Sequence, residues 1–332
     1  MDVLLSLPIV SYFAAPMLTS WSTSLNLLFF YMTWTTLVLS QTPLRIELAG
    51  TLAVRVVFWL APSLLFLVFD TLIPSLAESL KYYGRASLPG RRRTAAALLR
   101  QVLLAVATLL LLTAVQAAIS AAAAKYLRRP PFRASTALPL PWQIVKHVLA
   151  LYTAREVLTY YISRHVLHGG RALANLHARY AHTRRGAAPY ALMLFADHPL
   201  TLLLHRLVPA YLPALLVRPH LLTYFVFTVL TTVEEMLSMS GYSIVPGIVM
   251  GGIARRTAAH YASGGKGNYG AWGLLDWIHG TSVGKDVVED IHDEAEKHQV
   301  RERGGNAASD AGSTVQDGID SLKKRQKGRK KA

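Results

Sequence analysis

The chain contains several apolar stretches of about twenty residues, and these constrain its fold more than any other feature. Residues 21–39, 52–73 and 102–124 are each long enough to cross the roughly 30 Å hydrocarbon layer of a bilayer as a helix. The third stretch, VLLAVATLLLLTAVQAAISAAAA, contains no charged side chain. Pro62 is expected to kink the helix over 52–73. The pattern predicts an all-α, polytopic membrane protein.

Three later segments have less uniform patterns and do not all read as crossings. We expect about four hydrophobic helices in the whole chain. Residues 142–162 carry Lys, His, Arg and Glu side chains, so they form either a crossing or a helix buried against other helices. Four prolines within residues 187–217 favour short, broken or in-plane helices. Residues 221–239 return to a long apolar helix that contains Glu234 and Glu235.

Charge is distributed unevenly along the chain, which has 35 Lys and Arg against 19 Asp and Glu and a formal net charge of +16. Only five acids precede residue 197, so the first half cannot supply a carboxylate-rich metal site of the ferritin type. The chain has no cysteine, which excludes disulfides, zinc fingers, other thiolate metal sites and a cysteine nucleophile. Any metal must therefore be held mainly by histidine.

The basic residues gather in loops at the ends of the apolar segments and in the C-terminal run KKRQKGRKK. This placement favours a membrane and anionic lipid as partners, with no nucleic acid. The basic loops over 74–99 and 125–134 flank one span, so the positive-inside rule cannot hold for both, and we assign 74–99 to the cytosol. Lys330 and Lys331 loosely resemble a retrieval signal of the endoplasmic reticulum, which predicts that membrane and a cytosolic tail.

Four of the twelve histidines lie between residues 165 and 182. His165 and His168 are three residues apart, so on a helix they share a face and could hold one metal together. His177 and His182 are about 140° apart around an ideal helix, so the chain would need a local break to bring them together. The alternative interpretation is an interfacial segment, rich in His and Arg, that binds anionic lipid head groups.

Short motifs in the second half occur in a recognisable order: SRHVLH over 163–168, HARYAH over 177–182, DHPL over 197–200, SMSGYSIVP over 238–246 and AAHYASGGKGNYGAWGLLDWIHGT over 258–281. Their order and separations resemble the fatty acid hydroxylase and sterol desaturase superfamily of membrane di-iron oxidoreductases. The resemblance extends from about residue 141 to 284. Its most specific part is the last motif, with Asn-Tyr-Gly, Asp276 and Gly-Thr.

The resemblance implies iron, two ions if the site is intact, that supports oxygen-dependent hydroxylation or desaturation of a fatty-acyl or sterol-like lipid. The substrate would come from the bilayer and the electrons from a separate cytochrome or reductase. Glu234 and Glu235 are either a ligand or acceptors for a histidine N–H, or they form salt bridges with an arginine among Arg184, Arg185, Arg255 and Arg256. The expected metal ligands are His165, His168, His177, His182, His198 and His260.

The motifs also depart from the family pattern, because two irons held by imidazole need on the order of eight nitrogen ligands. Ser163 or Arg164 replaces the leading histidine of the first motif, and Met239 stands where the Ser-Gly-Tyr motif would have its histidine. Tyr180 and Ala181 occupy places where paired histidines could lie. The competing hypothesis is therefore a non-catalytic relative that keeps the fold as a lipid-binding or scaffolding membrane protein.

The predicted organisation has three parts. Residues 1–140 form a transmembrane region, residues 141–284 a hydroxylase-like domain with a cytosol-facing helical cap that bears the histidines, and residues 285–332 an acidic segment and a disordered basic tail. Four further histidines are expected to have structural or interfacial roles: His147, His205, His220 and His279.

Overall fold

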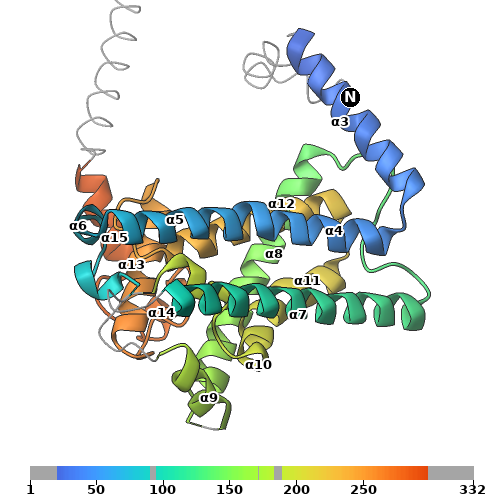
Figure 1. Cartoon of the computed structure of the whole chain (residues 1–332). Helices are drawn as coiled ribbons and strands as arrows, with labels where there is room; N and C mark the ends of the chain where they lie inside the picture. The colour runs from blue at the N-terminus through green and yellow to red at the C-terminus, as the bar shows by residue number, and fades with distance from the viewer. Residues whose placement is uncertain (1–20, 90–94, 171, 183–188, 298–332) are drawn as a thin grey trace, which may run out of the picture.

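The computed structural model describes residues 21–89, 95–170, 172–182 and 189–297. These residues form helices joined by short connections, and the only β contacts among them are two isolated bridges, Lys81 with Tyr242 and Arg133 with His220. The all-α prediction is confirmed (Figure 1). The basic tail from residue 298 lies outside the described residues.

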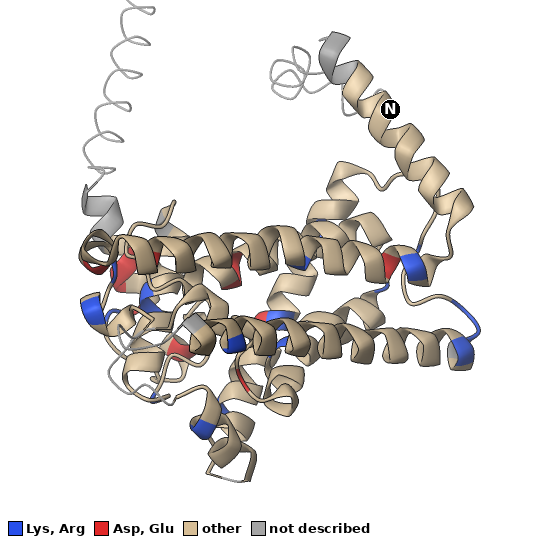
Figure 2. Cartoon of the chain, viewed as in Figure 1, with Lys and Arg blue, Asp and Glu red and all other residues tan. Residues whose placement is uncertain are grey.

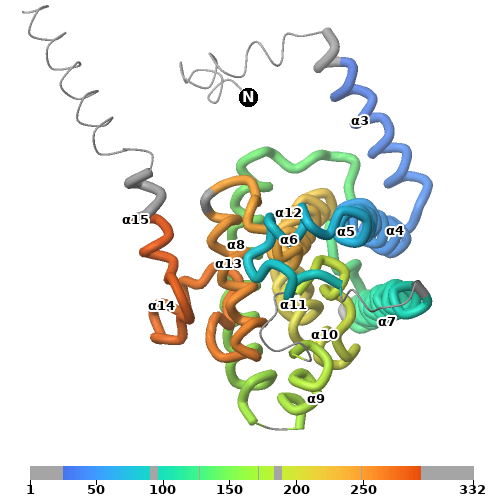
Figure 3. The backbone as a smooth tube through the Cα atoms, turned by 60° about the vertical axis from the view of Figure 1, so that its left-hand side comes forward, coloured from blue at the N-terminus to red at the C-terminus, as the bar shows by residue number. Residues whose placement is uncertain are grey.

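Four helices among the described residues are long and apolar enough to cross a membrane: Pro43–Leu72, Ala96–Tyr126, Pro199–Val217 and Leu221–Met239. Their number confirms the expectation of about four hydrophobic helices in a polytopic membrane protein. The expected span over 21–39 forms α3 (Trp21–Ser40), a helix of 20 residues. The part of α3 whose side chains are described, Leu25–Ser40, is apolar. This helix reaches away from the other helices in both Figure 1 and Figure 3.

The expected stretch 52–73 lies within one long helix made of α4 (Pro43–Arg55), the π turn η1 (Val56–Leu60) and α5 (Ala61–Leu72). The π turn comes immediately before Pro62. Ala61 donates its N–H to the carbonyl of Val56, five residues back, so the hydrogen-bond register changes where the proline removes a donor. The helix therefore continues past a residue that would otherwise break it.

A second π turn makes one of the sequence predictions wrong in part. The pattern over 187–217 predicts short, broken or in-plane helices, and residues 191–195 do form a short 3-10 helix. From Pro199 onward, however, α10 (Pro199–Leu202), the π turn η5 (Leu203–Leu207) and α11 (Val208–Val217) run on as one helix. Val208 donates to the carbonyl of Leu203 just before Pro209. The wider turn accommodates the proline, so the proline spacing does not fragment the helix.

The segment 142–162 forms α8 (Pro141–Ile162), which packs against α11 and α12 and is not among the four crossing-capable helices. It buries Arg155 and Glu156, as expected of a helix packed against others. The predicted long helix over 221–239 is α12 (Leu221–Met239), which contacts α4, α8 and α13 (Ile248–Ala262). Figure 3 shows α8, α11, α12 and α13 grouped beside the two long helices α4–α5 and α7 (Ala95–Leu127).

The remaining elements are short. They are α6 (Pro74–Leu80), η2 (Gly84–Ser87), the π turn η3 (Ser163–Leu167), α9 (Ala172–Tyr180), η4 (Ala191–Phe195), α14 (Leu274–Ile278) and α15 (Val287–Lys297). Together with the loop over 264–284 they form the end of the molecule that carries the histidines.

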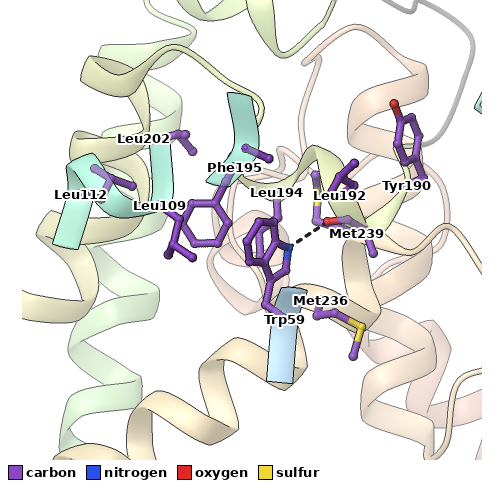
Figure 4. Packing of buried hydrophobic residues seen from close by; sticks show 12 residues of the cluster. Trp59, Leu109, Leu112, Tyr190, Leu192, Leu194, Phe195, Leu202, Met236 and Met239 are labelled. Carbon is purple, nitrogen blue, oxygen red and sulfur yellow. Dashed lines mark hydrogen bonds between the residues drawn. The ribbon is translucent and has the colours of Figure 1, made fainter. Parts of the chain in front are cut away.

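Two apolar cores pack the helices together, and the first joins the long helices to the end that carries the histidines. In the first, the buried Trp59 contacts Phe195 at a ring-centroid distance of 4.4 Å and donates Nε1–H to the carbonyl of Ala191 (Figure 4). Met239 is buried in the same core. The second core includes Phe132, Leu151 and Tyr224. The contacts of Trp59 in the first core hold η4 in place, and the segment after η4 leads to Asp197.

Candidate metal centre

Four imidazole rings meet at the end of α8 and α13. His168 follows η3, His177 lies on α9, His182 follows α9, and His260 lies in the last turn of α13. Five of the six ring pairs have centroid distances of 5.0–5.3 Å. The Nε2 atoms of His168 and His182 lie 3.2 Å apart. We call these four residues the histidine cluster.

The π turn η3 determines which histidine of the first motif joins the cluster. His168 donates its backbone N–H to the carbonyl of Ser163, five residues back, so the chain is wider here than an α-helix. His165 and His168 therefore do not share a face. His165 is exposed and stacks on Tyr161 at 6.0 Å, whereas His168 turns inward.

The local break required between His177 and His182 is present. Helix α9 ends at Tyr180, after the N–H of Ala181 donates to the carbonyl of His177. The chain then turns, and the ring of His182 comes to 5.0 Å from that of His177. Both side chains are buried.

The glycine loop after α13 closes over the cluster. The N–H of Gly265 donates to the carbonyl of His260, and Gly265 has φ +86°, which L side chains rarely adopt. A Cβ atom at Gly265 would lie 2.5 Å from Nε2 of His168 and 3.0 Å from Nε2 of His182. Glycine is therefore required both by the backbone conformation and by the space beside two candidate ligand atoms.

Hydrogen bonds fix the tautomer of three rings. The Nδ1–H groups of His168, His177 and His260 donate to the carbonyl of Ser163 (2.8 Å), to Oδ2 of Asp197 (2.8 Å) and to the carbonyl of Gly267 (2.7 Å). Each bond leaves Nε2 as the unprotonated nitrogen, as in metal sites where an outer acceptor orients the ligand. Nε2 of His168 is hydrogen-bonded to Nε2 of His182. Nδ1 of His182 is buried and has no hydrogen-bond partner among the described residues.

Burial keeps the rings of His168, His182 and His260 neutral at physiological pH. It lowers the pKa of His168 to about 4, that of His182 to about 2 and that of His260 to about 3. Neighbouring imidazoles lower these values further. The carbonyls of Ser163 and Gly267 oppose the shift for His168 and His260. Neutral imidazoles offer lone pairs, which is the form that binds metals.

The donor set fits one metal ion. One ligand nitrogen from each of His168, His177 and His182 lies within 4.8 Å of the others, and His260 adjoins them. Imidazole suits iron, zinc, copper and nickel. A second ion held in the same way would bring the requirement to about eight nitrogens. His205 adds one more ring near His177, at 6.1 Å, so the described residues fall short of that number.

His198 does not join the cluster. Its Nδ1 accepts the N–H of Leu200 and caps α10, and its ring lies 5.3 Å from Tyr180. Its neighbour Asp197 takes the role in the site instead, as the acceptor for His177. The sequence analysis missed Asp197 because it sits in the DHPL motif, where only the histidine was considered. It also missed His205, whose apolar neighbours suggested a structural residue.

Glu234 and Glu235 form ion pairs at the side of the cluster. Arg155 reaches Oε1 of Glu234 and Oε1 of Glu235, each at 2.9 Å, and Arg206 reaches Oε1 of Glu235 at 3.1 Å. The arginines expected as partners are not used. Arg255 and Arg256 pair with Asp290 of α15, and the other two expected arginines, 184 and 185, lie outside the described residues. We call Arg155, Arg206, Glu234 and Glu235 the arginine–glutamate network.

Two cavities adjoin the cluster. A small one of about 60 Å³ lies between His260 and His205 on one side and the arginine–glutamate network on the other. A more open one of about 520 Å³ is lined by His168, His182 and the glycine loop. Neutral, oriented imidazoles beside an accessible space are an arrangement suited to a metal with a position left for a reactant.

The fatty acid hydroxylase family model matches residues 148–281. This segment is therefore similar to the fatty acid hydroxylase family. It contains the whole histidine cluster, Asp197 and the arginine–glutamate network. Fatty acid hydroxylases are lipid-modifying membrane oxidoreductases and are generally iron-dependent, in agreement with the histidine cluster and the four crossing-capable helices. No solved structure matches this chain.

Proposed function

We propose that the protein is a membrane-bound oxidoreductase of lipid metabolism that uses histidine-held iron for oxygen-dependent hydroxylation or desaturation of a fatty-acyl or sterol-like lipid. The observation that carries the proposal is the orientation of the histidine cluster. Three rings have their Nδ1–H groups bound to acceptors and their Nε2 atoms unprotonated, within the segment that the fatty acid hydroxylase family model matches.

Each part of the site has a role in this proposal. The histidine cluster would hold the iron, which when bound would supply the activation of dioxygen needed to break an unactivated C–H bond. Asp197 holds the Nδ1 proton of His177, and the carbonyls of Ser163 and Gly267 hold those of His168 and His260. The protein thereby orients its ligands before the metal arrives.

The substrate would approach through the open cavity of about 520 Å³. The glycines at 264, 265 and 267 line it next to His168 and His182, and Gly265 leaves the space beside their Nε2 atoms open. Electrons would come from a separate cytochrome or reductase. We also propose residues 141–284 as the catalytic domain, facing the cytosol from the endoplasmic reticulum membrane.

A product assay tests the proposal. The full chain, reconstituted anaerobically with ferrous iron in nanodiscs, is mixed with lipid extract, a reductant and oxygen, and the lipids are analysed by mass spectrometry. We expect a lipid that gains one oxygen atom or loses two hydrogen atoms, and no such product from the His182→Ala variant. The matched control is His165→Ala, which changes an exposed histidine of the same segment. Equal product from wild type and His182→Ala would contradict the proposal.

One observation favours the second candidate, a non-catalytic relative that binds lipid or acts as a scaffold. Met239, at the place of a family histidine, is buried in the apolar core around Trp59, and the cluster offers four imidazoles where two irons need about eight. This candidate predicts that lipid binding is unchanged in His182→Ala and that no lipid is converted. The product assay and a lipid-binding measurement on the same samples separate the two.

A further inference from the structure

A group of arginines lies at the end of the molecule opposite the histidine cluster. Arg128, Arg129 and Arg133 follow α7, and Arg218 follows α11. Figure 2 shows basic residues at the C-terminal end of α7 and in the loop after it, whereas the glycine loop and α9 lie toward the other end of that helix in Figure 1. We call these four residues the arginine cluster.

Hydrogen bonds between the two loops hold the arginine cluster together. The N–H of Arg133 donates to the carbonyl of Pro219, and the carbonyl of Arg133 accepts from Leu221. The guanidinium of Arg218 donates to the carbonyls of Pro130 (2.8 Å) and Pro131 (3.4 Å). Two loops that are 85 residues apart in sequence are thus fixed side by side, so the arginines form a built surface.

The backbone at two of these positions would suit glycine better than arginine. Arg128 ends α7 with φ +52° and Arg218 caps α11 with φ +51°, both in the left-handed region. Glycine or asparagine usually occupies such positions after a helix, because a Cβ atom is unfavourable there. The chain places a positive charge at both despite that cost, which indicates a use for the charge.

The charges of the arginine cluster are not compensated within the described chain. None of the four arginines forms an ion pair with a described residue, and no Asp or Glu occurs between Glu78 and Glu156. Burial, followed by the like charges of Arg129 and Arg133, lowers the pKa of Arg218. An anion bound here would relieve this repulsion.

The surroundings indicate which anion. Exposed apolar side chains precede the arginine cluster at the ends of the two helices, with Tyr126 of α7 80% and Leu216 of α11 76% exposed. Tyr and Trp at the ends of membrane helices are typical of the level of the lipid head groups. A planar guanidinium binds phosphate oxygens through paired hydrogen bonds. We propose that the arginine cluster binds the phosphate of an anionic phospholipid at the membrane interface, far from the histidine cluster.

Native mass spectrometry of the full chain released from detergent tests this proposal. With equal amounts of dioleoyl phosphatidylglycerol and dioleoyl phosphatidylcholine, we expect bound phosphatidylglycerol to exceed phosphatidylcholine by about thirtyfold, since two basic residues at a membrane surface supply an effect of that order. The ratio should fall to about one in Arg128→Gln/Arg129→Gln. These exposed side chains leave the hydrogen bonds of Arg133 and Arg218 in place, so the loops are expected to fold.

Two further variants make the result decisive. Arg85→Gln/Arg100→Gln removes the same charge from exposed positions toward the other end of α7 and should keep the preference, and Arg128→Lys/Arg129→Lys should keep most of it. An unchanged preference in the Arg128→Gln/Arg129→Gln variant would overturn the proposal, as would an equal loss in the Arg85→Gln/Arg100→Gln control. Competition by millimolar inorganic phosphate as strong as by phosphatidylglycerol would also overturn it, because a lipid would then not be required.

Discussion

The histidine cluster and the arginine–glutamate network lie on two sides of the same small cavity, yet they satisfy their polar atoms in opposite ways. In the network, Arg155 pairs with both carboxylates and Arg206 adds a second bond to Glu235. In the histidine cluster, two Nε2 atoms face each other at 3.2 Å and one buried Nδ1 has no partner among the described residues.

This difference distinguishes the residues that hold the helices together from the residues that can bind a ligand. Buried charges that are paired hold helices in place, and removing one partner leaves the other charge buried and unpaired. Buried polar atoms without partners are uncommon and need an explanation, and a bound metal supplies one for the histidine cluster. The network therefore fixes α8, η5 and α12 relative to one another, and the histidine cluster keeps a capacity to bind a metal.

The largest effect should come from breaking the network. Arg155→Met leaves the buried carboxylate of Glu234 without its arginine and leaves Glu235 with Arg206 alone, so we expect the free energy of unfolding to fall by about 3–5 kcal/mol. Denaturant unfolding in detergent measures it. The matched control is Arg179→Met at an exposed position, which should change stability by less than about 0.5 kcal/mol. A loss under about 1 kcal/mol for Arg155→Met would show that the network is not a scaffold.

Changing the histidine cluster should give the opposite pattern. His182→Ala removes a ring whose Nδ1 is unpartnered, so the metal-free stability should change by about 1 kcal/mol or less. Metal affinity should fall by more than about 100-fold, because a ligand is lost rather than an outer partner. Titration with ferrous or cobaltous ion measures the affinity. A large stability loss with unchanged affinity would reverse the assigned roles.

A smaller effect on metal affinity is expected at Asp197, which contacts a candidate ligand and would not bind the metal itself. Asp197→Asn keeps an acceptor for Nδ1 of His177 but removes the negative charge. Metal affinity should fall by about 10- to 100-fold, less than for His182→Ala. The same titration provides the number. An unchanged affinity would mean that Asp197 does not support the site.

The pH dependence of the free energy of unfolding tests the role of Glu156. Its carboxylate accepts hydrogen bonds from the backbone N–H groups of Ala271 and Trp272 and so holds the loop after the glycines. Burial raises the pKa of Glu156 to about 7 from 4.5, although Arg155 opposes the shift. The stability that this group contributes is fully present below pH 4.5 and is lost as the pH rises through 7. Relative to Glu156→Gln, wild type should lose at most about 1.4 kcal/mol per pH unit across this window. Parallel stability profiles would contradict the assignment.

The smallest effect should come from the two histidines that lie outside the histidine cluster. His165→Ala and His198→Ala should change metal affinity by less than about twofold, because one ring is exposed and the other caps α10. A loss comparable to that of His182→Ala would show that the cluster rearranges to include them.

The sequence predicted the parts of this molecule that depend on local pattern. Apolar length identified the helices around 52–73 and 102–124 and the helix over 221–239, and the motifs contained every member of the histidine cluster. The errors arose at the π turns. The turn over 163–167 directs His168 inward and His165 outward, and the turn over 203–207 lets a helix continue past Pro209. Helical periodicity assumes 3.6 residues per turn and cannot register such changes.

Contacts between distant segments were also beyond the sequence patterns. Asp197 binds His177 across 20 residues, and Arg155 binds Glu234 across 79. A single sequence shows that a buried carboxylate needs a partner, but several arginines qualified and the fold alone selects among them. The arginine cluster shows the same limit, because Arg133 and Arg218 become neighbours only after α8 and α11 have packed.

The central claim is that the histidine cluster is a metal site with one ion. Its most direct test is the iron content of the full chain, purified in detergent and reconstituted anaerobically with ferrous iron, measured by plasma mass spectrometry beside His182→Ala and His165→Ala. The account predicts about one iron per chain in wild type and in His165→Ala, and almost none in His182→Ala. About two irons per wild-type chain, or none, would contradict it.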